Sequence, residues 1–390
     1  MIHRLFPLLF VAGLVAVPTA AQDAPVYPSD AGPYRVETVA DGLNFPWGMQ
    51  FLPDGGMLVT EKDPGRLRVV RDGVLVEQEI SGLPEIVVRG QGGLMDVRLH
   101  PGFEDNSMVY LSYSRACTTD GGDNGATTAV VRGALDLDAA ALTGVEDIFV
   151  ADACTARGQH FGSRMVFDDE GYLFVTVGDR GEMQQAQNTA NHQGTVNRLN
   201  DDGSIPSDNP FVGRNGYQPS IWAYGLRSPQ GLAIHPETRE LWETEHGPQG
   251  GDELNRIEAG SNYGWPIITY GVNYGSSRRP IGDGIAEAPG LEQPVHYWVP
   301  SIATSGLVIY DGDVFPEWRG SAFVGGLAGQ QLARVEFADD GSTTVEVLLG
   351  EHGQRIRDVR QGPDGHIYLL TDVGGEQASV LRLAPATAAN

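Results

Sequence analysis

Lysine is almost missing from this chain of 390 residues, because Lys62 is the only lysine among 26 basic side chains. Acidic residues number 51, so the formal net charge is −25 at pH 7. Binding to nucleic acid needs a surplus of basic side chains to neutralise phosphates, so this composition excludes nucleic acid as a partner. The same shortage excludes attachment to an anionic membrane through a polybasic surface.

Long apolar runs are also scarce. One run, Leu5–Val17, follows a short basic start and precedes the small residues 18–21, which is the layout of a secretory signal peptide. A run of about 13 apolar residues is too short to span a bilayer, so a permanent anchor is the weaker alternative. We therefore expect a signal peptide over residues 1–21, no membrane span after its removal, and a periplasmic or secreted protein. The rest, 22–390, is expected to form a single domain.

Only two cysteines are present, Cys117 and Cys154. In an oxidising compartment they can pair, but two unpaired buried thiols are an equally open alternative.

Helical periodicity is nearly absent, whereas turns followed by short apolar strands recur along the chain. With 52 glycines and 24 prolines, the sequence has ample turn-forming residues. Six copies of the turn and strand lie at residues 53–60, 100–113, 168–176, 235–243, 318–325 and 362–371.

Six units of about 61 residues, each with several strands, predict an all-β fold, a six-bladed β-propeller. A pair of packed β-sheets is the structural alternative, but it does not account for six copies of one turn. The strand Tyr34–Val39 is expected to close the ring against the last blade, which would protect an open edge. The long segments 114–165 and 245–300 are expected to be functional loops on one face.

Three groups of residues in this pattern carry chemistry. His160 lies in the run 158–164, immediately before a strand. Its imidazole can act as a general base near neutral pH, or it can form a hydrogen bond within its own loop and have only a structural role. The run 245–255 combines carboxylates with glycine-exposed carbonyls, the hard oxygen ligands that Ca²⁺ prefers, without EF-hand spacing. Arg355 and Arg357 alternate on a strand and so face one side, as suits a ligand with several carboxylates.

Many short sequence motifs, in the same order along the chain, resemble those of one family, the soluble aldose branch of the pyrroloquinoline quinone (PQQ)-dependent sugar dehydrogenases. The resemblance extends from about residue 35 to 383. The phrases lie at residues 45–49, 90–94, 160–164, 178–181, 227–231, 245–255, 262–266, 298–301 and 355–359.

This resemblance implies an enzyme that binds PQQ and Ca²⁺ and oxidises an aldose at C1 to the lactone. His160 would be the base that takes the C1 hydroxyl proton. The carbonyls of Gly247 and Pro248 would hold the catalytic Ca²⁺, and Glu253 and Tyr263 would belong to a structural Ca²⁺ site. The residues matching the PQQ site are Gln91, Arg227, Ser228, Tyr274, Ala328, Arg355 and Arg357.

Three positions depart from the family pattern. Gln159 stands where the glucose-specialised branch has an aspartate before the base, so it cannot stabilise an imidazolium by charge. Ser228 stands where asparagine is common. Ala328 occupies the place of a lysine that often contacts the cofactor, which removes one cation.

Two other function classes remain open from the sequence: a metal-dependent lactonase and a non-catalytic binding propeller. As a dehydrogenase, the protein would need an aldose substrate and an electron acceptor that the sequence does not identify. Either a monomer or a homodimer is compatible with the sequence.

Overall fold

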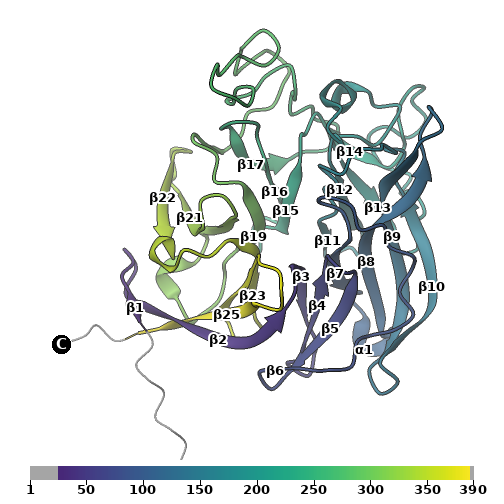
Figure 1. The fold of residues 1–390 in the computed structure, drawn as a ribbon. Coiled ribbons are helices and arrows are strands. Elements are labelled where there is room, and N and C mark those ends of the chain that lie inside the picture. The colour runs from purple at the N-terminus through teal and green to yellow at the C-terminus, as the bar shows by residue number, and fades with distance from the viewer. Residues whose placement is uncertain (1–24, 387–390) are drawn as a thin grey trace, which may run out of the picture.

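The computed structural model describes residues 25–386, and these residues are built almost entirely of β-strands (Figure 1). Within them, six antiparallel sheets surround a central axis, so the predicted six-bladed β-propeller is confirmed. The predicted signal peptide over 1–21 lies outside the described residues.

Each blade has four strands in order from the axis outward, and the last blade carries a fifth. Blade 1 contains β3 (Pro46–Phe51), β4 (Met57–Glu61), β5 (Arg66–Arg71) and β6 (Val74–Leu75). Blade 2 contains β7 (Leu94–Leu99), β8 (Met108–Thr118), β9 (Asn124–Asp136) and β10 (Ala141–Val150). Blade 3 contains β11 (Met165–Phe167), β12 (Leu173–Val177), β13 (Thr195–Leu199) and β14 (Ile221–Tyr224).

The second half of the ring has the same plan. Blade 4 contains β15 (Pro229–Ile234), β16 (Leu241–Glu245), β17 (Asp252–Ile257) and β18 (His296–Trp298). Blade 5 contains β19 (Thr304–Ile309), β20 (Ala322–Gly326), β21 (Gln331–Phe337) and β22 (Thr343–Leu348). Blade 6 contains β23 (Ile356–Gln361), β24 (Ile367–Thr371), β25 (Ala378–Pro385), β2 (Tyr34–Leu43) and β1 (Val26–Tyr27).

Helices are short in the described part of the chain: α1 (Phe103–Asn106), η1 (Met183–Gln187), η2 (Pro316–Trp318) and η3 (Gly350–His352). None of them is long and apolar enough to cross a membrane.

The ring closes as predicted, by a strand from the beginning of the chain. In β2, Tyr34 pairs with Pro385 and Leu43 pairs with Ala378 of β25, and Figure 1 shows the purple strand beside the yellow one. This closure covers the edge that β25 would otherwise expose.

Six apolar clusters fill the spaces between neighbouring blades. Leu58 of blade 1 packs in one cluster with Val109 of blade 2, and Leu332 of blade 5 shares another with Leu369 of blade 6. The other clusters join the remaining neighbours in the same way. The six turns found in the sequence join the first and second strands of the blades, so they recur once per blade.

One expectation about the loops was wrong. Segment 114–165 is largely strand, because it holds the end of β8 and all of β9 and β10. Segment 245–300 contains β17 and β18, and only the part between them forms a long loop, which rises at the top of Figure 1. The turn-and-strand pattern marked the inner strands of each blade, whereas β9 and β10 are outer strands with turns of a different kind.

A cluster of charged side chains occupies the axis of the ring, and we call these five residues the axis cluster. Asp96 and Arg98 come from β7, Arg164 precedes β11, and Asp358 and Arg360 come from β23. Their ion pairs measure 3.0–3.2 Å between nitrogen and oxygen. The cluster therefore ties together blades that are far apart in the sequence.

The carboxylates of the axis cluster are buried, and both form ion pairs with arginines. Asp96 is 0 % exposed and also accepts hydrogen bonds from the backbone N–H of Met165. Burial favours the neutral form, but Arg98, Arg164 and Arg360 outweigh it and lower the pKa of Asp96. Gly48 is required beside it, because a Cβ there would lie 2.7 Å from Asp96 Oδ1.

Both cysteines are used in a disulfide between Cys117, in β8, and Cys154. The sequence left this pairing open. Such a bond points to an oxidising, extracytoplasmic compartment.

Candidate active site

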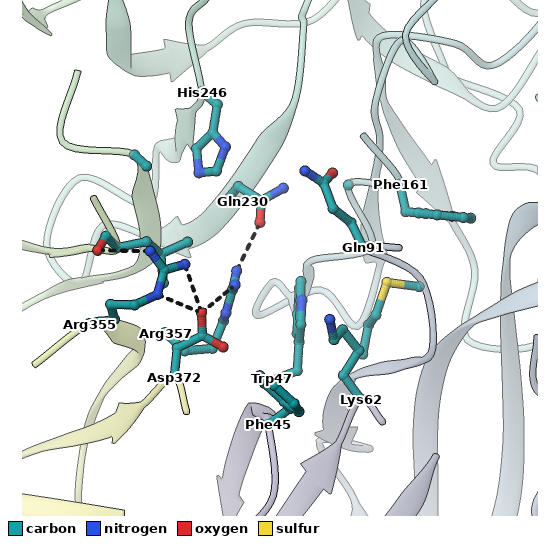
Figure 2. A pocket seen from close by; sticks show the side chains of 14 residues that line it. Phe45, Trp47, Lys62, Gln91, Phe161, Gln230, His246, Arg355, Arg357 and Asp372 are labelled. Atoms are coloured by element: carbon teal, nitrogen blue, oxygen red, sulfur yellow. Dashed lines mark hydrogen bonds and ion pairs between the residues drawn. The ribbon is translucent and has the colours of Figure 1, made fainter. Parts of the chain in front are cut away.

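A cavity of about 320 Å³ opens at one end of the ring, and its lining comes from all around the axis (Figure 2). The lining residues lie near the beginnings of first strands or just after second strands, and these positions share one end of antiparallel blades. The lining residues are Phe45, Trp47, Lys62, Gln91, Met95, Phe161, Gly162, Gln230, His246, Ala303, Leu327, Arg355, Arg357 and Asp372.

His160 lies next to this lining, in the loop before β11. Its backbone φ of +51° is unusual for a non-glycine residue, and the side-chain oxygen of Gln91 accepts its N–H at 2.7 Å. The imidazole is buried, with 9 % of the side chain exposed, and its Nδ1 lies 2.6 Å from Oδ1 of Asp179. Asp179 thereby fixes the ring and leaves Nε2 for the second hydrogen-bonding role.

Asp179 is a buried carboxylate held in position by several donors. Its Oδ2 accepts the indole N–H of Trp265 at 2.8 Å, and its Oδ1 accepts the backbone N–H of Gly181 at 2.7 Å. Burial raises the pKa of Asp179, but the contact with His160 and the charge of Arg227 outweigh burial and lower it. The carboxylate is therefore ionised beside the imidazole.

The pKa of His160 is lowered from its usual value. Burial is the largest cause, and the charge of Arg227 adds to it, while Asp179 acts in the opposite direction. The imidazole is thus neutral near pH 7, as a proton acceptor must be.

The imidazole of His160 has a carboxylate partner, although the residue before it is Gln159. Asp179 supplies this carboxylate to Nδ1 from a different loop. The sequence contained Asp179 in the phrase 178–181, yet only folding brings it to His160.

Positive charge gathers on the blade 6 side of the cavity. Asp372 accepts hydrogen bonds from Nη2 of Arg355 at 2.9 Å and from Nη2 of Arg357 at 3.1 Å (Figure 2). Burial raises the pKa of Asp372, but Arg357 and Arg355 hold it below its usual value. One carboxylate is thus shared by two guanidinium groups, and Nε of Arg357 is buried without a hydrogen-bond partner among the described residues.

Arg227 and Ser228 lie one layer behind the cavity. Glu245 accepts both of their backbone N–H groups, and Nη1 of Arg227 donates to the carbonyl of His246 at 2.8 Å. Burial raises the pKa of Glu245 to about 7. Ser228 Oγ accepts a hydrogen bond from Gln230, a lining residue, at 3.3 Å.

Two further predicted contacts also lie outside the cavity lining. Tyr274 is 70 % exposed, in the long loop between β17 and β18. Ala328 is exposed and follows the lining residue Leu327. Of the predicted PQQ residues, Gln91, Arg355 and Arg357 line the cavity itself.

Gly247 and Pro248 follow His246, which does line the cavity. The N–H of Gly247 donates to Oδ1 of Asp252 at 3.0 Å. Within residues 25–386, no hydrogen bond uses the carbonyl oxygens of Gly247 and Pro248. Both oxygens are therefore available as ligands for a hard cation.

A second group of oxygens has the character of a cation site. Nδ2 of Asn255 donates to Glu243 at 3.2 Å and to Glu253 at 3.3 Å, so two carboxylates flank one amide. Burial, reinforced by the charge of Glu245, raises the pKa of both carboxylates well above the usual value. Oε1 of Glu243 and Oδ1 of Asn255 are buried and have no hydrogen-bond partner in the described part of the chain.

These oxygens without hydrogen-bond partners are suitable ligands for a cation. The carboxylates by themselves, however, are too few to complete its coordination. Among residues 25–386, no three histidine, cysteine, aspartate or glutamate side chains are placed to hold a metal ion. Amide or backbone oxygens would have to complete the coordination. The hydroxyl of Tyr263 donates to the carbonyl of Arg256 at 2.6 Å, so it is already engaged.

Sequence reasoning missed several residues of the site: Trp47, Lys62, Asp179, Gln230, Glu243, His246 and Asp372. Trp47, Asp179 and His246 stood within recognisable phrases. Lys62 and Asp372 follow ordinary strands, and no local pattern distinguishes them.

The arrangement is that of a six-bladed propeller with a histidine–carboxylate pair beside a basic cavity. The family model described as glucose / sorbosone dehydrogenase matches residues 43–382, and the chain belongs to this family. Aldose sugar dehydrogenase YliI of Escherichia coli is 41 % identical over 377 residues, which cover 96 % of this chain and 98 % of the relative. Quinoprotein glucose dehydrogenase B of Acinetobacter calcoaceticus is 27 % identical, covering 94 % and 92 %.

Solved structures agree with this assignment. The soluble aldose sugar dehydrogenase of Escherichia coli, in its apo form, matches with a TM-score of 0.84 and 41 % identity, covering 90 % of this chain and 100 % of that one. The PQQ-bound aldose sugar dehydrogenase of Streptomyces coelicolor matches with a TM-score of 0.73 and 26 % identity, covering 90 % and 98 %.

Proposed function

We propose that the protein is a PQQ- and Ca²⁺-dependent dehydrogenase that oxidises the C1 hydroxyl of aldose sugars to the lactone. The observation that carries this proposal is the neutral, buried His160, held by Asp179 beside a cavity lined with cations. The resemblance to PQQ-dependent relatives supports the choice of cofactor.

The chain's residues fit PQQ by charge and shape. Arg355 and Arg357 share a single carboxylate and retain donors for an anion with several carboxylates. The indole of Trp47 and the ring of Phe161 provide flat apolar surfaces in the lining. Gln91 joins the lining to the base, because it accepts the N–H of His160.

When bound, PQQ supplies the acceptor for the hydride from C1, and Ca²⁺ supplies a Lewis acid beside it. His160 would accept the C1 hydroxyl proton at Nε2. Asp179, at Nδ1, would stabilise the imidazolium that results, since its carboxylate remains ionised. Gln91 and the backbone around His160 would keep the ring in this orientation.

The carbonyls of Gly247 and Pro248 would hold the catalytic Ca²⁺. Glu253 and Tyr263, together with Glu243 and Asn255, would form the structural Ca²⁺ site. Tyr263 would contribute its backbone, because its hydroxyl is engaged. Arg227 and Ser228 would support the PQQ site from behind, while Tyr274 and Ala328 would act from its margins.

We further propose that residues 22–390 form one dehydrogenase domain, exported to the periplasm or secreted after removal of a signal peptide over 1–21. The disulfide is consistent with this location. The protein would pass electrons to a separate acceptor and would act as a monomer or a homodimer.

One assay tests the function. Purified chain is mixed with PQQ and Ca²⁺, and reduction of an artificial dye is measured with a panel of aldoses. We expect dye reduction that depends on PQQ. Absence of reduction and of any change in the PQQ absorbance contradicts the proposal. Hydrolysis of lactones without PQQ would indicate the lactonase instead, and ligand binding that is indifferent to loss of His160 would indicate a non-catalytic propeller.

A further inference from the structure

The single lysine of the chain lies in the cavity. Lys62 directly follows β4, and its side chain joins the lining with Phe45 and Trp47 of the same blade. In Figure 2 it lies on one side of the Trp47 ring, while Arg355, Arg357 and Asp372 lie on the other.

The ammonium group of Lys62 lacks a carboxylate partner within residues 25–386. Its Nζ donates to the carbonyl of Gly90 at 3.2 Å and lies 5.4 Å from the centre of the Phe45 ring. Burial and then the charge of Arg357 lower the pKa of Lys62, so the surroundings disfavour its charge.

The nearest acidic group in the lining is already shared. Asp372 pairs with Arg355 and Arg357, which leaves the cavity with three cations and one carboxylate. A bound anion would relieve this excess. Such an excess stands out in a chain whose net charge is −25.

We propose that Lys62 is a cofactor-binding residue that contacts a carboxylate of PQQ, as the third cation of the cavity. This inference rests on the proposed function. It offers a source for the positive charge that is absent at Ala328, because Lys62 reaches the same cavity from blade 1 rather than from blade 5.

A purely structural role is the competing explanation. Lys62 bonds the carbonyl of Gly90, and the next residue, Gln91, holds the backbone of His160. Loss of Lys62 could therefore disturb the loop without any contact to a ligand, and the experiment must separate these two roles.

The first measurement is the Kd for PQQ. It is determined from the change in protein fluorescence as PQQ is added, with Ca²⁺ in excess. Lys62→Met keeps the apolar stem and removes the charge, and we expect a roughly 10- to 100-fold weaker Kd. Lys62→Arg keeps the charge and should retain most of the affinity. Arg71→Met, on the exposed part of the same blade and paired with Asp54, is the control and should not change Kd.

The second measurement uses the fact that the chain has one ε-amino group. The extent of Lys62 acetylation is measured by peptide mass, with and without PQQ. We expect bound PQQ to reduce acetylation of the Lys62 amine. Protection shows that bound PQQ covers the amine, and the retained affinity of Lys62→Arg then separates a charge contact from a structural role. Equal affinity in Lys62→Met, equal weakening in both Lys62 variants, or unprotected Lys62 in PQQ-saturated protein would each overturn this inference alone. Wild-type chain that binds no PQQ would overturn the proposed function as well.

Discussion

The axis of the propeller and the cavity at its end both contain buried arginines and aspartates, but their charges are balanced differently. In the axis cluster, Asp96 and Asp358 together engage three arginines at 3.0–3.2 Å and accept backbone N–H groups as well. In the cavity, the lining has three cations but one carboxylate, Asp372, which pairs with Arg355 and Arg357 and leaves Lys62 without an acidic partner among the described residues. Charged side chains that form ion pairs within the chain hold blades together. An excess of one charge instead indicates a surface that binds a ligand of the opposite charge.

The candidate cation site also contains unbalanced charge, but there the unbalanced groups are carboxylates. Glu243 and Glu253 face only the amide of Asn255, and the pKa of each is raised by burial. Neither carboxylate has a basic partner within 4 Å in the described residues. Substitutions in the axis cluster should therefore lower the free energy of unfolding. Substitutions in the cavity and in the cation site should instead weaken ligand binding.

Breaking the axis cluster should have the largest effect. Asp96→Asn leaves Arg98, Arg164 and Arg360 without their shared carboxylate, and we expect the free energy of unfolding to fall by about 3–5 kcal/mol. Urea denaturation measures this change. Asp54→Asn removes an exposed ion pair with Arg71 and should cost at most about 1 kcal/mol. Equal losses in the two variants would contradict the architectural role.

Removing the base should abolish most of the activity without unfolding the protein. His160→Ala should lower kcat by about 10²- to 10⁴-fold, because general base catalysis typically contributes that much. The Kd for PQQ should change little. His235→Ala, in the turn between β15 and β16, is the matched control and should keep its rate. A near wild-type rate in His160→Ala would reject the assignment.

Removing the partner of the base should have a smaller effect and a distinct pH dependence. Asp179→Asn loses a charge-assisted hydrogen bond, so we expect kcat to fall by about 10- to 100-fold. Asp179 raises the pKa of His160 against burial, and the base acts only when neutral. The rate of the wild type should therefore fall as pH drops through a value below 6.5, and in Asp179→Asn this acid limb should move lower still. A shift toward higher pH would contradict this model of the pair.

Calcium removal should have the smallest effect on the free energy of unfolding, and a variant of Glu243 should show whether that effect comes from the candidate cation site. In the wild type, Ca²⁺ at ten times its Kd should raise the free energy of unfolding by about 1.4 kcal/mol over the value in chelator. Glu243→Gln should gain less from Ca²⁺, yet be at least as stable in chelator, since it removes a buried carboxylate without a cation partner. Glu258→Gln, an exposed acid paired with Arg256, should behave as the wild type in thermal unfolding. An unchanged response to Ca²⁺ in Glu243→Gln would remove it from the site.

Local pattern explains which parts of the structure were predictable. The six turns before β4, β8, β12, β16, β20 and β24 have strong turn residues, so they revealed the number of blades. The outer strands β9 and β10 were mistaken for a loop because they lie outside that repeated turn. Arg355 directly precedes β23 and Arg357 lies within it, and both line the cavity as predicted, because alternate residues of an extended segment point the same way.

The sequence alone determined the sixfold repeat and the excess of acidic side chains, because each is a matter of composition or short-range spacing. Only the tertiary structure decided which charges meet. Lys62 shares a cavity with Arg357 because the closed ring brings blades 1 and 6 together at one end of the axis. His160 meets Asp179 because the loops before β11 and after β12 lie at the same end of blade 3, and Cys117 of β8 meets Cys154, which follows β10 of the same blade. Whether a buried charge is compensated depends on such distant neighbours, and no local pattern records them.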